Sequence, residues 1–319
     1  MEYVSIKEIP GIRIGNAEDL TGGTGCTVII CDKGGTGGVD VRGGAPGTRE
    51  TDLLNPVNLV DKIHGILLAG GSAFGLDAAA GIMEYLEERR IGFDVGVTKV
   101  PIVAGAVLFD LAVGDYKIRP DKKMGYRACL NSESEEFTEG CVGAGTGASV
   151  GKILGMDKAM KGGLGSFCIR VGRLYVGAIV AVNCLGDVVE PASGQILAGA
   201  YSSEDKRFLN SESIMIDGFQ KAGDPFTGNT TIGAIITNGK LTKAGANKIA
   251  SMAHNGYARS IRPTHTMHDG DTIFALATGD VDADVNQIGV LAAKAMEQAV
   301  INGIKKASGL FGLKSFSEI

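Results

Sequence analysis

Glycine recurs along the whole of this chain beside strongly apolar segments, and it accounts for 49 of the 319 residues. This share is about twice the ~7% that is usual in globular proteins. The glycines follow no collagen-like period, and the apolar segments beside them are not typical of a disordered chain. We therefore expect many tight turns and close approaches between backbones, as in a layered α/β protein with contacts between subunits.

Short apolar runs, grouped in pairs, predict the strands. They cover residues 27–31, 39–41, 66–69, 166–171, 175–183, 232–237 and 272–277. Helical periodicity predicts one helix after Gly70-Gly71-Ser72, a second over residues 242–258, and a long last helix that Asp284 caps. Paired strands joined by short turns favour an antiparallel or mixed sheet with helices outside it. The sequence therefore predicts an α/β (α+β) fold with αββα layering.

Two stretches are predicted to connect these elements without regular structure of their own. The glycine run at residues 34–38 favours a turn between two strands. Residues 201–228 are polar, with closely placed serines and several charges, and favour an exposed linker. Its last part, residues 221–228, is rich in residues that break regular structure and leads directly to strand 232–237.

Charge and hydropathy exclude several classes of protein. The net charge is −5, the pI is about 5.5, and lysine and arginine are dispersed, which argues against nucleic acid as a partner. No apolar run approaches the ~18–20 residues of a membrane span. Residues 1–8 lack the apolar core of a signal peptide, so we expect a cytoplasmic protein with no membrane partner. The six cysteines show no C-x-x-C spacing and are expected in the core, not in disulfides or a zinc site.

The stretch Gly228-Asn229-Thr230-Thr231 stands between the polar loop and strand 232–237. Here a chain can cut itself: the Thr230 hydroxyl attacks the Asn229 carbonyl, an ester forms by an N→O acyl shift, and water releases a new N-terminus. The freed Thr230 then holds a hydroxyl nucleophile and an α-amine base in one residue. An unperturbed α-amine has a pKa of roughly 7.7–8.0, so it can act as a base near neutrality. For these four residues alone, a polar turn before a strand is the alternative interpretation.

Four further candidate site residues lie in turns or near predicted strand ends. Asp269 and Asp271 flank a turn before strand 272–277, where two carboxylates can share a proton or orient an amine and a hydroxyl. An ordinary Asx turn is the alternative there. Asn183 ends strand 175–183, where its amide can donate to an oxyanion or simply end the strand. Lys152 follows a glycine run and is either a lysine in a cleft, acting on an oxyanion or a base, or a lysine on a helix surface.

Glycine-rich stretches also raise the possibility of a nucleotide site. Gly143-x-Gly145-x-x-Ala148 matches a relaxed dinucleotide fingerprint but lacks a clear preceding strand in a βαβ unit. Gly151-Lys152 does not belong to a P-loop, because the glycine and the hydroxyl residue of that motif are missing. Three nearby histidines (His254, His265 and His268) lack the spacing of metal ligands, and His265 and His268 are expected to line the entrance near Asp269. We therefore expect neither a metal nor a cofactor.

Several sequence blocks occur here in the order of one known family and cover nearly the whole chain. They lie at residues 11–17, 22–28, 42–51, 68–76, 100–103, 143–147, 229–231 and 269–272. On these blocks the chain resembles the DmpA-type peptidases, family S58, which include L-aminopeptidase/D-esterases, β-aminopeptidases and endo-type 6-aminohexanoate-oligomer hydrolases. The pairs Asn229-Thr230 and Asp269-x-Asp271 look more like the nylon-oligomer hydrolase branch than the Gly-Ser and Ser-x-Glu of aminopeptidase members.

The resemblance implies a four-layer αββα sandwich of the DmpA type, similar to N-terminal-nucleophile hydrolases. It implies one catalytic domain over residues 1–319 that is processed into a large chain, 1–229, and a small chain, 230–319. It further implies these roles: Thr230 as nucleophile after the cut behind Asn229, Asn183 as oxyanion donor, Lys152 as a catalytic-site lysine, and Asp269 and Asp271 as groups that orient the nucleophile and its amine. Some members place a tyrosine after Val-Pro-Ile-Val, where Phe109 stands here. Phe109 and Tyr126 therefore remain alternatives for lining the site.

The implied function is a self-processing amide hydrolase that acts on a small peptide or an amide oligomer without a cofactor. The family also implies a homo-oligomer, a tetramer of processed heterodimers. Two alternatives stay open. The first is acyl transfer to an amine, as in the similarly folded ornithine acetyltransferases, and the second is a non-catalytic nucleotide-binding protein that uses the glycine loops. The physiological substrate and the choice between exo and endo cleavage stay open as well.

Overall fold

The computed structural model describes residues 1–134, 136–218 and 228–319. Within them a mixed ten-stranded sheet has the order β1-β11-β12-β17-β19-β3-β5-β8-β4, with β2 beside β3. Its strands are β1 (Glu2–Val4), β2 (Arg13–Asp19), β3 (Thr24–Val41), β4 (Thr48–Arg49), β5 (Lys62–Ala69), β8 (Val103–Val107), β11 (Gly163–Val171), β12 (Leu174–Val182), β17 (Ile232–Gly239) and β19 (Thr272–Val281). The pairs β17–β19 and β5–β8 are parallel and the other pairs are antiparallel. The mixed sheet predicted from paired strands is confirmed.

The long strand β3 takes part in two layers of this sheet. Residues 26–30 pair with β5 and β2, whereas residues 36–41 pair with β19. The register with β5 shifts between Ile30 and Gly35, and Gly34 takes a φ of +69° there, a conformation that suits glycine. The prediction of a turn at residues 34–38 is therefore wrong. Glycine serves close packing instead, since a Cβ at Gly38 would lie 2.4 Å from backbone atoms of helix α4 (Lys243–Ser260).

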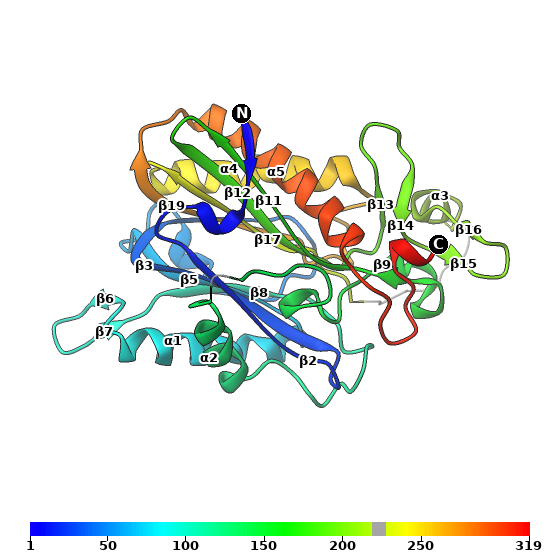
Figure 1. The fold of residues 1–319 in the computed structure, drawn as a ribbon, viewed down its shortest axis with the longest axis horizontal. Coiled ribbons are helices and arrows are strands. Elements are labelled where there is room, and N and C mark those ends of the chain that lie inside the picture. Colours follow the sequence, from blue (N-terminus) through cyan, green and yellow to red (C-terminus); the bar gives the residue numbers. More distant parts are fainter. Residues whose placement is uncertain (135, 219–227) are drawn as a thin grey trace.

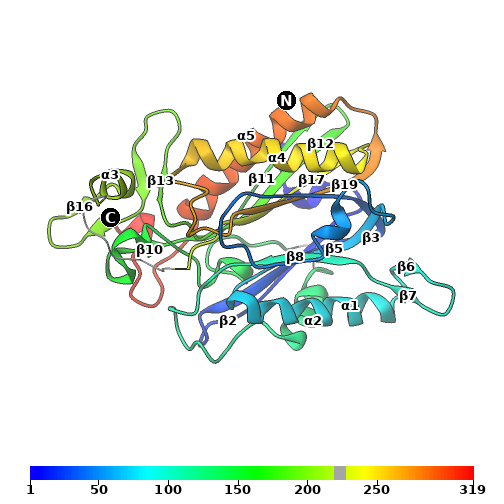
Figure 2. The ribbon, with the colours of Figure 1, turned by 180° about the vertical axis from the view of Figure 1, so that it is seen from behind.

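Helices cover both outer faces of the two sheet layers (Figure 1). Helices α4 and α5 (Val285–Lys305) lie on one side, and α1 (Ala78–Glu88) and α2 (Lys122–Asn131) lie on the other, as the reverse view also shows (Figure 2). Apolar side chains alternate accordingly. In β17, Ile232, Ala234 and Ile236 pack between the sheet layers, while Ile235 packs toward α4 and α5. A third apolar layer joins α1 and α2 to β3 and β5, which completes a four-layer αββα sandwich.

The remaining β-strands and α-helix of the described chain are short. They are the hairpin β6 (Phe93–Asp94) and β7 (Lys99–Val100), and β9 (Ser149–Val150), β10 (Met160–Lys161), β13 (Asp187–Val189), β14 (Ile196–Ala198), β15 (Tyr201–Ser202), β16 (Arg207–Phe208), α3 (Ser211–Asp217) and β18 (Ile261–Arg262). The region 201–218, expected to be an exposed linker, therefore has regular structure. The buried carboxylate of Asp187 organises it by accepting hydrogen bonds from the backbone and side chain of Ser211. Residues 221–227 of the predicted loop lie outside the described residues.

The cysteines are mostly core residues. All six cysteines have free thiols and five of them are buried, as expected for core residues. No helix in the described ranges combines the length and the apolar character needed to cross a bilayer.

Strands from the two ends of the chain are interleaved in the sheet. Both β17 and β19 follow the Asn229–Thr230 bond in sequence, yet they lie between β12 and β3. The pairs β12–β17 and β19–β3 therefore join the segments before and after this bond by backbone hydrogen bonds. A cut between Asn229 and Thr230 would leave both products in one sheet with a shared core.

The crossing of α1 and α2 depends on two glycines. A Cβ at Gly81 would lie 1.8 Å from the carbonyl oxygen of Lys122, and a Cβ at Gly125 would lie 2.0 Å from that of Ala78. We expect Gly81→Ala to lower the free energy of unfolding by about 1–3 kcal/mol, because the two helices must move apart. This loss exceeds the gain in helix propensity, which is at most about 1 kcal/mol. Thermal or denaturant unfolding measures the difference.

A matched control lies at the end of α3. Gly218 has a φ of −70°, and a Cβ there would meet no atom of the described residues within 4 Å. Gly218→Ala should leave the free energy of unfolding within about 0.5 kcal/mol of the wild-type value. Equal stability of the Gly81→Ala and Gly218→Ala proteins would contradict the account of the helix crossing.

Candidate active site

The predicted site residues meet at one edge of the sheet. Thr230 lies just before β17 and the Asp269–Asp271 turn lies just before β19, and because these strands are parallel their beginnings are neighbours. Strand β12 runs antiparallel to β17, so its end brings Asn183 to the same edge. An isolated bridge between Asn229 and Asp269 continues the parallel pairing beyond the strands.

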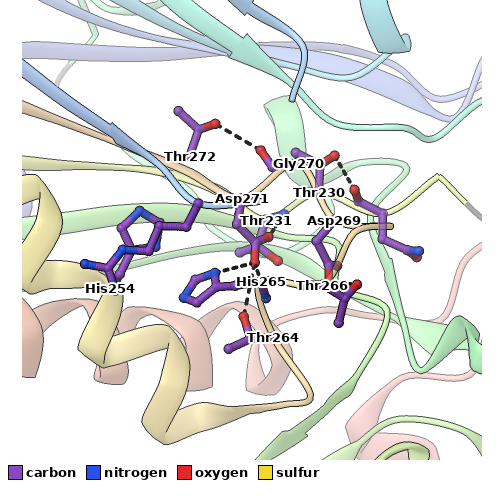
Figure 3. A network of polar contacts seen from close by, with 12 residues as sticks. Thr230, Thr231, His254, Thr264, His265, Thr266, Asp269, Gly270, Asp271 and Thr272 are labelled. Atoms are coloured by element: carbon purple, nitrogen blue, oxygen red, sulfur yellow. Dashed lines mark hydrogen bonds and ion pairs between the residues drawn. The ribbon is translucent and has the colours of Figure 1, made fainter. Parts of the chain in front are cut away.

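Hydrogen bonds with neighbouring residues hold the Asn229–Thr230 peptide bond in place. The Thr230 hydroxyl donates to the carbonyl oxygen of Asn229, and the same oxygen accepts the Gly270 N–H at 2.9 Å (Figure 3). The Thr230 N–H donates to the carbonyl oxygen of Asn183 at 3.0 Å. Thr230 is only 5% exposed and Asn229 only 2%. A buried site thus brings together the Thr230 hydroxyl, the Asn229 carbonyl and the Gly270 N–H, which donates to that carbonyl.

Asn183 and Lys152 form a second part of the site. The Asn183 Oδ1 atom accepts hydrogen bonds from the Ser149 N–H at 3.0 Å and from Lys152 Nζ at 2.9 Å, and its Nδ2 donates to the carbonyl oxygen of Phe109 at 3.1 Å. Lys152 Nζ also donates to the backbone carbonyl of Asn183 at 3.1 Å. Lys152 is 1% exposed, so the alternative of a helix-surface lysine is wrong. Burial lowers the pKa of Lys152 to about 8, although nearby Cys184 and Asp269 oppose this shift.

The two carboxylates of the turn differ in their surroundings. Burial alone would raise the pKa of Asp271, but hydrogen bonds from His265 and from the Thr231 N–H outweigh it and lower that pKa. Burial, and next the charge of Asp271, raise the pKa of Asp269, while bonds from Thr266 oppose the rise. Two close carboxylates whose pKa values move apart are typical of a site where one carboxyl group holds a charge and the other can hold a proton.

Several groups near Thr230 carry little local sequence signal. The Gly270 N–H contacts the Asn229 carbonyl, and a Cβ at Gly270 would lie 2.6 Å from the Thr230 hydroxyl, so only glycine fits between the two aspartates. The Ser149 N–H is a second such group, because its contact with Asn183 depends on the fold alone. His265, expected from the sequence only to line the entrance near Asp269, donates to Asp271. The motif at 42–51 did signal the loop that packs on this turn, where Ala45 N–H donates to Asp269 O at 2.8 Å.

Phe109, and not Tyr126, lies at this site. Its carbonyl accepts from Asn183, and its ring packs so closely on Gly228 that a Cβ there would lie 2.4 Å from ring atom Cγ. The Tyr126 hydroxyl donates instead to Glu88, and its ring packs against Tyr85 beside α1.

A cavity of about 270 Å³ lies beside Lys152 and Phe109. A wider cavity of about 560 Å³ adjoins it, and the two share Ala112, Val113 and Met156. Tyr201, Phe311 and Lys314 line the wider cavity. The Lys152 side of the site therefore borders two adjoining cavities.

The glycine stretch 143–148 has a structural role. Its carbonyl groups at Gly145 and Ala148 accept hydrogen bonds from the buried Lys161 Nζ at 3.0 and 2.9 Å. The N–H groups of Gly143 and Ala144 are bonded to side chains within the protein, so they do not form an anion-binding loop. Among the described residues, no cluster of three or more His, Cys, Asp or Glu side chains could hold a metal ion.

Comparison with known proteins identifies relatives along nearly the whole chain. The model of peptidase family S58 matches residues 5–316. An uncharacterized aminopeptidase of Mycobacterium leprae is 39% identical over 98% of this chain and 93% of its own length. A 6-aminohexanoate-oligomer endohydrolase of Kocuria sp. is 32% identical over 93% of this chain and 85% of its own.

Solved structures show the same fold at low sequence identity. A β-aminopeptidase of Burkholderia sp. superposes with a TM-score of 0.70 at 18% identity, covering 98% of this chain and 91% of that one. The L-aminopeptidase D-Ala-esterase/amidase of Ochrobactrum anthropi, described as a variant of the Ntn hydrolase fold, gives a TM-score of 0.71 at 17% identity and covers 95% and 86%. The resemblance inferred from the sequence blocks is thus confirmed. The chain belongs to peptidase family S58, and it is a hydrolase of amide bonds.

Proposed function

We propose that the chain is a self-processing N-terminal-nucleophile amide hydrolase. Thr230 first cuts the Asn229–Thr230 bond and then acts from the new N-terminus on amide substrates. One observation supports this most directly. The Thr230 hydroxyl lies against the Asn229 carbonyl while the Gly270 N–H donates to the same oxygen at 2.9 Å.

Self-cleavage begins when Thr230 Oγ1 bonds to the carbonyl carbon of Asn229. Negative charge grows on the carbonyl oxygen, where the Gly270 N–H stabilises it. The C–N bond then breaks and the hydroxyl proton passes to the departing nitrogen, which leaves an ester. Water hydrolyses this ester and releases the carboxylate of Asn229 and the α-amine of Thr230. The products are residues 1–229 and 230–319.

The second reaction uses the same atoms on a substrate. The Thr230 hydroxyl attacks the substrate carbonyl, and the α-amine takes the proton and returns it to the leaving amine. One N–H of the Asn183 side chain donates to Phe109, and the other serves the oxyanion. Asp269 and Asp271 hold the turn beside the nucleophile. Water then hydrolyses the acyl-enzyme.

Lys152 keeps the α-amine of Thr230 in its neutral, basic form. Lys152 Nζ and the Thr230 nitrogen both donate to the carbonyl oxygen of Asn183, at 3.1 and 3.0 Å. After cleavage these are two amines that share one acceptor, and a positive charge on Lys152 disfavours a second one on Thr230. The α-amine therefore accepts a proton from the hydroxyl more readily.

The substrates are peptides or oligomers of ω-amino acids. The relatives are named as aminopeptidases and as 6-aminohexanoate-oligomer endohydrolases. An aminoacyl anilide and a linear 6-aminohexanoate oligomer, each tested with and without an acceptor amine, distinguish these two classes and also distinguish hydrolysis from acyl transfer.

The choice of nucleophile can be tested with three variants. Thr230→Val removes the proposed nucleophile and should abolish self-cleavage, whereas Thr230→Ser should still cleave because it keeps a hydroxyl group. Thr231→Val removes the neighbouring buried hydroxyl and should still cleave. Intact mass under denaturing conditions follows all three proteins. Cleavage of the Thr230→Val chain at the same bond would contradict the mechanism.

The role of Lys152 predicts a pH effect with a definite sign. In Lys152→Met the positive charge near Thr230 is lost, so the pKa of the α-amine rises. The acid limb of kcat/KM for the processed enzyme should then move to higher pH by about one pH unit. Lys152→Arg keeps the charge and should retain the wild-type limb. A limb that moves to lower pH in Lys152→Met would contradict this role.

A further inference from the structure

The carboxylate of Asp271 connects the nucleophile strand to a group that has no role so far. Its Oδ1 atom accepts the Thr231 N–H at 2.9 Å, directly after Thr230. Its Oδ2 atom accepts the Thr264 hydroxyl at 3.1 Å and two groups of His265. Asp271 is 1% exposed, so its carboxylate depends on these donors and not on solvent for hydrogen bonds. Whatever fixes Oδ2 therefore also fixes the position of the Thr231 N–H.

His265 contacts Asp271 Oδ2 with both its backbone N–H and its side chain. Its N–H donates at 3.1 Å, and its imidazole Nδ1 lies at 2.9 Å from the same oxygen (Figure 3). This double contact coincides with a φ of +60° at His265, a conformation that non-glycine residues rarely adopt. Such backbone strain persists only where surrounding interactions compensate for it, and it gathers at functional sites.

Two aromatic side chains of α4 pack against the imidazole of His265. The ring centroid of His265 lies 4.8 Å from that of His254 and 6.2 Å from that of Tyr257. His254 Nε2 lies 3.0 Å from the carbonyl oxygen of Asp40, which can only accept, so this nitrogen carries the proton. Burial lowers the pKa of His254 to about 4 and keeps the ring neutral. A neutral, packed ring behind His265 fixes its orientation without adding a charge.

We propose that His265 is a positioning residue for the nucleophile, because its Nδ1–H holds the Asp271 carboxylate that anchors Thr231 and therefore Thr230. The inference rests on the proposed self-processing function. His265 does not touch the reacting atoms. It acts through Asp271, and its loss should slow both self-cleavage and substrate hydrolysis by allowing the carboxylate to rotate away from the Thr231 N–H.

Two variants at His265 and one control separate the hydrogen bond from the backbone strain. Asn tolerates a positive φ and places a side-chain N–H where Nδ1 stands, so His265→Asn should cleave itself within about threefold of the wild-type rate. Gly also tolerates a positive φ but has no donor, so His265→Gly should cleave about tenfold to a hundredfold more slowly. Added imidazole should partly restore the rate of His265→Gly. His268→Ala, on the same loop, is the matched control and should cleave at the wild-type rate.

Mass spectrometry over time measures how fast a chain that begins with Thr230 appears. The unfolding temperature of each protein is measured alongside. A His265→Gly chain that cleaves as fast as the wild type would overturn the inference. So would a His265→Asn chain as slow as His265→Gly at equal unfolding temperature. In either case the proposed function would stand, whereas cleavage of the Thr230→Val chain would remove the proposed function itself.

A readout independent of catalysis uses the Thr230→Val protein. Nitrogen-15 NMR of its histidines reports which ring nitrogen carries the proton. We expect the proton of His265 on Nδ1, hydrogen-bonded to Asp271, and a neutral His254 protonated on Nε2. A His265 ring with Nδ1 unprotonated would overturn the inference.

Discussion

The parallel pairing of β17 with β19 is the constraint on which the site depends. It sets Ile232 opposite Thr272, so the residues just before the two strands are also neighbours. The pairing continues past the strand ends through the bonds from Gly270 N–H to Asn229 and from Thr231 N–H to Asp271. The antiparallel strand β12 adds Asn183 at the same edge. Because these contacts belong to the sheet itself, the fold fixes the position of Thr230.

Burial determines the chemistry of this edge. Lys152, Asp269 and Asp271 are each at most 1% exposed, and each is held by several hydrogen bonds, which is how charged groups are tolerated in an apolar interior. The same burial lowers the pKa of Lys152 and raises that of Asp269, whereas hydrogen bonds from His265 and Thr231 outweigh burial at Asp271 and lower its pKa. Thr230 is itself buried before any cleavage, so on the proposed mechanism the end of the large chain must leave Phe109 before a substrate can approach. Processing would thus open the site as well as create the amine.

Local patterns predicted most of the fold. Apolar runs gave strands 232–237 and 272–277, and Asp284 is indeed the cap of the last helix. The glycines at 34–38 misled the prediction. The sequence does not distinguish a glycine in a turn from a glycine in a strand that allows a helix to pack closely against it. The region 201–218 misled it as well, since a buried carboxylate, Asp187, orders polar residues that look like a linker. Sequence blocks pointed to the site residues, but the Gly270 N–H, Ser149 N–H and His265 depend on contacts between distant segments, which spacing alone does not reveal.

The most direct test of the central claim is the intact mass of the purified wild-type chain under denaturing conditions, with N-terminal sequencing of the smaller product. The proposed mechanism predicts two chains, residues 1–229 and 230–319, the second beginning with Thr230, which stay together as one particle without denaturant. A chain that remains uncut at 32.9 kDa after long incubation near neutral pH, and yet hydrolyses amides, would contradict it.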